Sequence, residues 1–175
     1  LGLEDCVIYV PDNEKKLLIQ KAAYGNKNLG QNQIMNPVEI PFGKGIVGDV
    51  AATGIASLVN DTSKDSRYLV DDASRMSELT VPVIHDEKLI AVIDSEHSKK
   101  NFFTKQHLNA IQTIAALCSA KISGAMANDA MRKSKLELME LNVKMAESKF
   151  INLRLQMNPH LLFNSLSSIQ HLIVS

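Results

Sequence analysis

The sequence lacks an excess of charge of either sign. It contains 19 Lys and Arg residues against 19 Asp and Glu residues, so the formal net charge at pH 7 is +0. Aromatic residues make up only 5% of the chain, and no basic patch with interleaved aromatics appears. Nucleic-acid-binding proteins carry such a patch as an electrostatic footprint, so the composition argues against a nucleic-acid partner.

Long apolar runs and paired cysteines are also missing. No uninterrupted run approaches the length of about eighteen residues that a membrane span needs, and no signal peptide is visible. The two cysteines, Cys6 and Cys118, belong to no CxxC pair or metal-ligand spacing, so we expect small buried side chains in a reducing compartment. These features predict a soluble, cytoplasmic chain. It begins without Met and ends in mid-pattern, so we expect a piece of a longer protein that could carry a membrane anchor elsewhere.

Enough apolar material is present for a real core. Hydrophobic residues make up 45% of 175 residues, which suits one domain plus an appendage. Upstream of residue 104 the pattern is one of short β-rich runs bounded by turn residues. We expect strands at 5–10, 17–24, 38–40, 56–59, 79–84 and 89–94, a helix at 46–53 and a loop at 26–36. This order predicts an α+β fold, an antiparallel sheet flanked by helices.

Downstream of Thr104, which we expect as an N-cap, the pattern becomes helical. Steps of three and four residues from Leu108 to Met157 trace a heptad seam that includes the polar residues Asp129 and Arg132. A helix of roughly fifty residues would be about 75 Å long and needs a partner helix, so we predict a parallel homodimer. The polar pair would set the register of this coiled-coil signalling helix, although a locally weak stretch that responds to a signal is an alternative.

A proline and a histidine mark the end of this helical pattern. Pro159 removes a backbone donor and clashes with the carbonyl group four residues back, so we expect a kink that exposes His160. Beyond the kink, apolar residues continue at helical spacing but two residues out of the earlier register. They are Leu162, Leu166, Ile169 and Ile173. A neutral imidazole can be phosphorylated near neutral pH, whereas the plainer alternative is a helix break beside a surface histidine.

The run QMNPHLLFNSLSSI at 156–169 resembles the phosphoacceptor segment of LytS-type sensor histidine kinases. The resemblance implies that His160 accepts a phosphoryl group and that Asn164, one turn on, orients its ring. It also implies Mg-ATP, held by an ATP-binding domain of the parent kinase, and a response regulator as partner. Leu161 departs from the acidic residue that follows the histidine in many other histidine kinases. Residues 158–175 would begin the dimerisation and phosphoacceptor module, which we expect to be inactive without the ATP-binding domain.

Three upstream runs resemble a GAF domain in order and spacing: IPFGKGIVGDVAATGIASLVNDTSKDSRYL, SELTVPVIHDEKLIAVIDSEH and NFFTKQHLNAIQTIAALCSAKI. The resemblance assigns 1–122 to a GAF sensory domain, with its first helix mostly missing, and leaves 123–157 as the signalling helix. It implies a small-molecule pocket between the sheet and its covering loops. We expect a mainly apolar cavity under residues 61–76, because few basic residues lie nearby. Candidate contacts for an unknown ligand are Arg67, Tyr68, Ser77 and Glu78, although the loop residues serve equally well in turns and caps.

Two other groups of residues have plain structural explanations. Gly43-Lys44-Gly45 lacks the full P-loop pattern and serves as a helix entry. Glu96, His97, His107 and His85 have no metal-ligand spacing, so we expect them at the surface and predict no metal site or resident cofactor.

The sequence favours the sensory and phosphoacceptor part of a two-component histidine kinase. The competing class is a non-enzymatic GAF dimer that binds a small molecule. A third class, a cyclic-nucleotide-dependent regulator, is disfavoured because no NKFDE-type motif is present.

Overall fold

The computed structural model describes residues 2–30, 33–156, 163–164, 167 and 169. Contacts divide the chain into two units, Leu1–Ala125 and Met126–Ser175. Unit 1 contains a six-stranded antiparallel sheet with helices packed on it, so the expected α+β fold is confirmed. The predicted kink at Pro159 lies outside the described residues.

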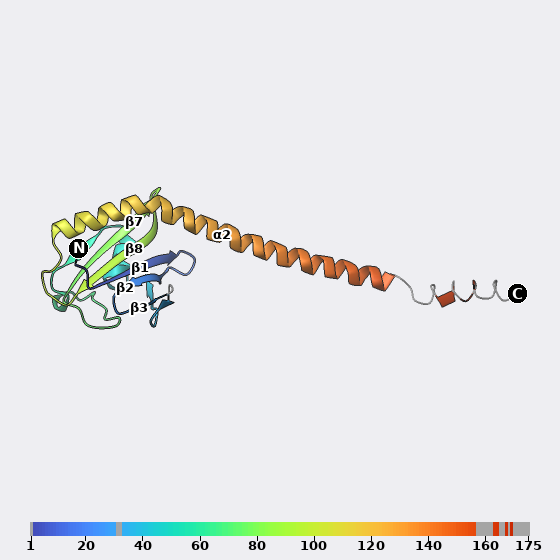
Figure 1. The fold of residues 1–175 in the computed structure, drawn as a ribbon, viewed down its shortest axis with the longest axis horizontal. Helices are drawn as coiled ribbons and strands as arrows, with labels where there is room; N and C mark the ends of the chain where they lie inside the picture. Colours follow the sequence, from blue (N-terminus) through green and yellow to red (C-terminus); the bar gives the residue numbers. More distant parts are fainter. Residues whose placement is uncertain (1, 31–32, 157–162, 165–166, 168, 170–175) are drawn as a thin grey trace. The chain divides into compact units, whose positions relative to one another are not determined.

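The sheet has the strand order β5-β2-β1-β8-β7-β6, and every neighbouring pair is antiparallel. The two central strands, β1 (Asp5–Asp12) and β8 (Lys88–His97), are far apart in the sequence and pair side by side (Figure 1). β2 (Leu17–Tyr24) and β5 (Glu39–Pro41) extend the sheet beyond β1, whereas β7 (Ser77–His85) and β6 (Ser57–Val59) extend it beyond β8. The pairing therefore brings β1, β8 and β7 together at the centre.

Two features of the loops differ from the sequence-based expectation. The expected loop at 26–36 contains a separate two-stranded sheet of β3 (Asn28–Gly30) and β4 (Gln33–Ile34). All three residues of β3 are exposed, so no apolar alternation announces that strand. The segment before β7 also contains a 3₁₀ turn, η1 (Thr62–Lys64), which the sequence did not predict.

The helix α1 (Gly45–Thr53) covers one face of the sheet. Its Val47, Val50 and Ala51 form a core cluster with side chains of β1, β2 and β8, namely Val7, Tyr9, Leu18 and Val92. Gly54 ends the helix in the left-handed region, with φ at 70°, and its N–H donates to the carbonyl of Val50 at 2.9 Å. A Cβ at Gly48 would lie 2.4 Å from the carbonyl oxygen of Pro41, so only glycine allows α1 to approach β5 this closely.

The helix α2 (Lys105–Gln156) begins at the expected cap: the Thr104 hydroxyl accepts the N–H of His107 at 3.4 Å. In unit 1, Ile111 and Ala115 are only 2% and 4% exposed, and Ala115 shares a small hollow with Val81 of β7. This corrects the expectation that the whole seam needs a partner helix, because a sheet face can cover the same helical stripe. Further along, the seam is exposed at Leu136, Met139, Val143, Phe150 and Leu153.

One helix in the described part of the chain, Lys105–Arg154, is apolar and long enough to cross a membrane by length and composition. Polar residues such as Gln112 and Thr113 interrupt its apolar run. Its most apolar window has a mean hydropathy of 1.2.

Candidate functional site

Buried carboxylates gather on the face of the sheet that α1 covers. The strand register places Asp5, Glu96 and Glu78 directly opposite one another on β1, β8 and β7, and places Asp94 opposite Thr80 in the next row. The four acidic residues are between 2% and 8% exposed. Like charges directly opposite destabilise a sheet, and buried charges are costly, so this arrangement does not serve stability.

These carboxylates form the floor of a cavity of about 260 Å³. The first turn of α1, strand β5 and the loop before β7 form its walls. The remaining lining residues are Val7, Tyr9, Val38, Glu39, Ile40, Pro41, Lys44, Gly45, Ile46, Val47, Leu69, Val70 and Asp71. The cavity therefore combines largely apolar walls with an acidic floor.

Burial changes the ionisation of the floor. Desolvation, followed by the charge of Glu96, raises the pKa of Glu78 to about 8. Desolvation and the charge of Asp94 likewise raise the pKa of Glu96 to about 8. Desolvation and Glu78 raise the pKa of Asp94 well above its usual value, although the Thr80 hydroxyl lies 2.8 Å from Asp94 Oδ1 and opposes the shift. The floor thus holds protons at neutral pH that ordinary carboxylates would release.

A polar network ties the walls of the cavity together. Gln20 on β2 donates from Nε2 to the Tyr9 hydroxyl at 2.9 Å and to Asp71 Oδ2 at 2.7 Å. Its Oε1 accepts the backbone N–H of Val38 at 3.1 Å and the ammonium of Lys27 at 3.0 Å. Lys27 is 2% exposed and also pairs with Asp71. Gln20 therefore connects β1, the residue before β5 and the loop before β7.

A second buried cation neutralises part of the acidic group. Arg75 is 4% exposed, and its Nη2 lies 3.4 Å from Asp72 Oδ2 and 3.6 Å from Asp5 Oδ2. One carboxylate oxygen each from Asp5, Asp72 and Glu96 lies within 4.8 Å of the others, a spacing that could hold a metal ion. Because Arg75 pairs with two of them, the chain itself supplies positive charge at that point. Asp5 Oδ1 nevertheless has no hydrogen-bond partner among the described residues.

Most of the chain matches a known domain family. The family model described as the GAF domain matches residues 1–123. The chain belongs to the GAF domain family. Its α+β architecture and the cavity between sheet, α1 and covering loop are the GAF fold that the sequence motifs predicted.

This GAF domain is similar in sequence or structure to proteins with several different names. Protein YtsP of Bacillus subtilis is 33% identical over 66 residues, which cover 38% of this chain and 40% of YtsP. The match therefore spans about two fifths of that relative's length. The type II free methionine-R-sulfoxide reductase of Thermoplasma acidophilum is 25% identical with a TM-score of 0.59, covering 69% of this chain and 79% of that one. The GAF domain of an Acinetobacter phosphoenolpyruvate-protein phosphotransferase is 24% identical with a TM-score of 0.62, covering 71% and 74%.

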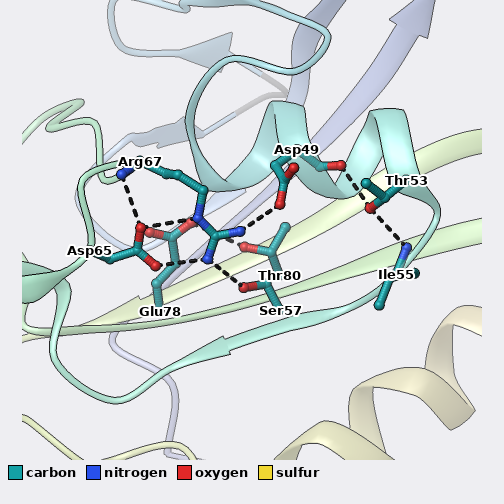
Figure 2. Close-up of polar contacts among 8 residues, drawn as sticks. All are labelled: Asp49, Thr53, Ile55, Ser57, Asp65, Arg67, Glu78 and Thr80. Atoms are coloured by element: carbon teal, nitrogen blue, oxygen red, sulfur yellow. Dashed lines mark hydrogen bonds and ion pairs between the residues drawn. The ribbon is translucent and has the colours of Figure 1, made fainter.

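The predicted ligand contacts of the GAF domain do not lie together. Glu78 lines the cavity, and the hydroxyl of Tyr68 accepts the backbone N–H of Arg75 beside it. Arg67 does not line the cavity. Figure 2 shows its guanidinium between Asp49 of α1, at 2.5 Å, and Asp65, at 2.7 Å, with the Ser57 hydroxyl at 3.4 Å. Arg67 therefore fastens the covering loop to α1.

The other predicted site residues lie further from the cavity or cannot be placed. Ser77 alternates with Glu78 along β7, so its side chain points away from the floor, and its hydroxyl donates to the carbonyl of Lys99 at 2.7 Å. His160 lies outside the described residues. Asn164 is described as helical and exposed.

Two expectations from the sequence need correction. Glu96 and His97, expected at the surface, are each only 8% exposed. Both lie on a central strand, where each face of the sheet is covered, and the His97 ring stacks on Phe102 with centroids 3.6 Å apart. The walls of the cavity are largely apolar, as expected, but its acidic floor of four carboxylates was not predicted.

Asp5, Asp94 and Glu96 were not predicted as site residues. A signal was available in the run LIAVIDSEH, where two acidic residues follow a continuous apolar run at a spacing of two. In a strand that is buried on both faces, such a spacing puts both carboxylates on one buried face. The expected strand ended at Asp94, so Glu96 was expected at the exposed end of a strand, whereas β8 continues to His97.

Proposed function

We propose that this chain is the sensory and phosphoacceptor part of a two-component histidine kinase, in which the GAF domain binds a small molecule. The observation that carries the sensory part is the cavity, whose floor holds four buried carboxylates, three of which lie directly opposite one another across neighbouring strands. A fold retains such a costly group when a ligand uses it. The motif around His160 supports the phosphoacceptor part.

Binding fits this cavity better than the redox chemistry named for the Thermoplasma relative. Reduction of a sulfoxide by side chains alone needs a thiol nucleophile at the substrate. The described lining of the cavity contains no cysteine. Cys6 alternates with Asp5 and Val7 on β1 and therefore points to the opposite face of the sheet, and Cys118 lies on α2.

Signal output would pass through the long helix of a homodimer. The seam residues Leu136, Met139 and Phe150 are 56% to 68% exposed, and such large apolar side chains favour a second copy of the same helix. Replacing these three residues with Asp should give a monomer in sedimentation. A wild-type chain that sediments as a monomer at micromolar concentration would contradict the dimer.

Chemical output would occur at His160. A ring nitrogen attacks the γ-phosphorus of Mg-ATP, an N–P bond forms, and the bond from phosphorus to the oxygen of ADP breaks. An ATP-binding domain presents the nucleotide, Asn164 orients the ring, and an aspartate of the response regulator receives the phosphoryl group.

The phosphoacceptor proposal is tested by adding an ATP-binding domain, in cis or as a separate protein, with Mg-ATP. The expected product is an acid-labile, base-stable phosphoramidate that His160→Gln abolishes and the control His171→Gln leaves in place. Asn164→Ala should slow labelling without dissociating the dimer. Labelling that survives His160→Gln would favour the non-enzymatic GAF dimer instead.

Coupling between the cavity and the output is tested with two tryptophan variants. Val70 is 61% exposed at the cavity wall, so Val70→Trp should fill the space that a ligand uses. Ile55 is 71% exposed and does not line the cavity, so Ile55→Trp is the matched control. We expect only Val70→Trp to change the labelling rate of His160. Equal rates for both variants would separate the cavity from the output.

A further inference from the structure

The charges around the cavity are unbalanced. Six carboxylates lie buried or half-buried in the group that forms and flanks the floor: Asp5, Asp71, Asp72, Glu78, Asp94 and Glu96. Two buried cations of the described residues, Lys27 and Arg75, pair with members of this group. Six minus two leaves an excess of four negative charges if every carboxylate ionises. Lys44 also lines the cavity but is exposed to solvent.

This imbalance determines which ligands the floor can accept. An anion, such as the phosphate of a cyclic nucleotide, would add a like charge to a desolvated acidic surface. A cation would instead pair with carboxylates that otherwise have to hold protons. Asp5 lines the cavity, is 2% exposed, and has an oxygen without a hydrogen-bond partner among the described residues. Asp5 therefore offers this oxygen as an acceptor to a ligand that carries donors.

The walls limit the rest of the ligand. Apolar side chains from β1, α1 and the covering loop line the rest of the cavity: Val7, Ile46, Val47, Leu69 and Val70. A volume of about 260 Å³ lies just below the range typical of ligand pockets, about 300–1,000 Å³. A short apolar chain would fill these walls, whereas a nucleotide would not fit.

We propose that the cavity binds a small protonated amine that carries a short apolar chain, with its ammonium group on Glu78, Asp94 and Glu96. The proposal rests on the sensory function proposed above and specifies its ligand class. The amine could belong to a simple alkylamine or to a free amino acid. In an amino acid, Lys44 would face the carboxylate at the cavity wall.

Binding of a cation should release protons. The pKa values of Glu78 and Glu96 stand at about 8 in the unliganded fold, and an ammonium group on the floor lowers them. The charged and titratable groups that act on these two residues are Asp94, Asp5, Asp65, Tyr68 and Arg75. Affinity should therefore rise about tenfold between pH 6.5 and 8, and level off above the pKa values of the floor.

Three probes differ only in their charged groups: n-butylammonium, L-norvaline and pentanoate. Norvaline carries both the amine and the carboxylate on the same chain, and each of the other probes keeps one of the two. We expect calorimetry on the full chain to detect n-butylammonium and norvaline but not pentanoate. Tighter binding of norvaline, lost in Lys44→Ala, would place the amine in an amino acid, and tighter binding of n-butylammonium would place it in a simple amine.

Variants of the floor locate the binding. Glu78→Gln and Asp94→Asn should each weaken n-butylammonium binding about tenfold and reduce its dependence on pH, whereas Glu14→Gln, in the exposed β1–β2 turn, should leave both unchanged. Pentanoate binding as tightly as the amine, or no binding of any probe, would overturn the amine proposal. Failure of the sensory function looks different: the amine would bind, and neither the amine nor Val70→Trp would alter labelling of His160.

Discussion

Adjacent residues of β7 are equally buried on the two faces of the sheet but differ in polarity. Along β7, Glu78 and Thr80 point to the cavity, whereas Leu79 and Val81 point to the other face, and all four are at most 3% exposed. Along β8, Asp94 and Glu96 alternate with Ile93 and Ser95 in the same way. Burial alone therefore does not separate the core of this domain from its site. The polarity of the buried side chains does.

The two faces also contribute differently to the stability of the domain. Each apolar side chain on the face away from the cavity stabilises the fold by leaving water. The contribution is about 1.5–3 kcal/mol for a fully buried residue of the size of leucine or valine. Each carboxylate on the face toward the cavity loses hydration, and Asp5, Glu78 and Glu96 also meet another carboxylate across the strands. Along such a strand, substitutions at adjacent positions should change the free energy of unfolding in opposite directions.

The largest expected effect is at Leu79, on the face away from the cavity. Leu79 is 0% exposed, so Leu79→Ala removes buried methyl groups and leaves a void. We expect a loss of about 2–5 kcal/mol in the free energy of unfolding, measured by urea denaturation of the full chain. The exposed Leu29 on β3 is a matched control, and Leu29→Ala should change stability by less than about 0.5 kcal/mol. Similar losses at both positions would contradict the assignment of Leu79 to the core.

The next effect, at Glu78, has the opposite sign. Its pKa rises from an ordinary 4.5 to about 8 in the fold, so the folded state binds more protons than the unfolded state between these values. This contribution to stability is fully present below pH 4.5 and is lost as the pH rises through 8. Glu78→Gln removes the titration and keeps the shape. We expect the variant to be more stable than the wild type by about 2–4 kcal/mol at pH 9 and close to it at pH 5.

Comparing denaturation curves of the two proteins at each pH isolates this group from all others that titrate. Glu14→Gln, at an exposed turn, should follow the wild type throughout. A Glu78→Gln protein that is less stable at pH 9 would mean that Glu78 is a stabilising ion-pair partner. Together with weaker amine binding, the expected gain would show that the floor favours a ligand at the expense of the fold.

The fold was largely predictable from the sequence because its signals are local. Turn residues bound most strands, and β2 was predicted with its observed limits, Leu17–Tyr24. Glycines mark both ends of α1, and Thr104 caps α2. The two-stranded sheet of β3 and β4 was missed because its residues are exposed and short strands without alternation resemble loops.

The candidate site was only partly predictable, because cross-strand register creates it. Asp5 and Glu96 are far apart in sequence and become neighbours only when β1 pairs with β8. Glu78 was predicted as a loop residue, yet it lies within β7. Arg67 was predicted as a ligand contact, but its guanidinium forms ion pairs with Asp49 and Asp65. Lys27 was not predicted as a buried residue because it lies in the expected loop at 26–36, but its ammonium is buried against Asp71.

The smallest expected effect is at Thr80, which lies between the two acidic rows. Its hydroxyl lies 2.8 Å from Asp94 Oδ1 and 3.1 Å from Glu78 Oε1, and its single proton can serve one of them at a time. Thr80→Val keeps the shape and removes this donor. A hydrogen bond to an ionised carboxylate is worth more than one to a neutral carboxyl group, so the loss should be about 1 kcal/mol at pH 5 and about 2 kcal/mol at pH 9. Denaturation at the two pH values measures the difference, and Thr113→Val, at an exposed position of α2, is the control. A loss that does not change with pH would mean that the hydroxyl stabilises neutral groups, and that the floor of the cavity keeps its protons even at pH 9.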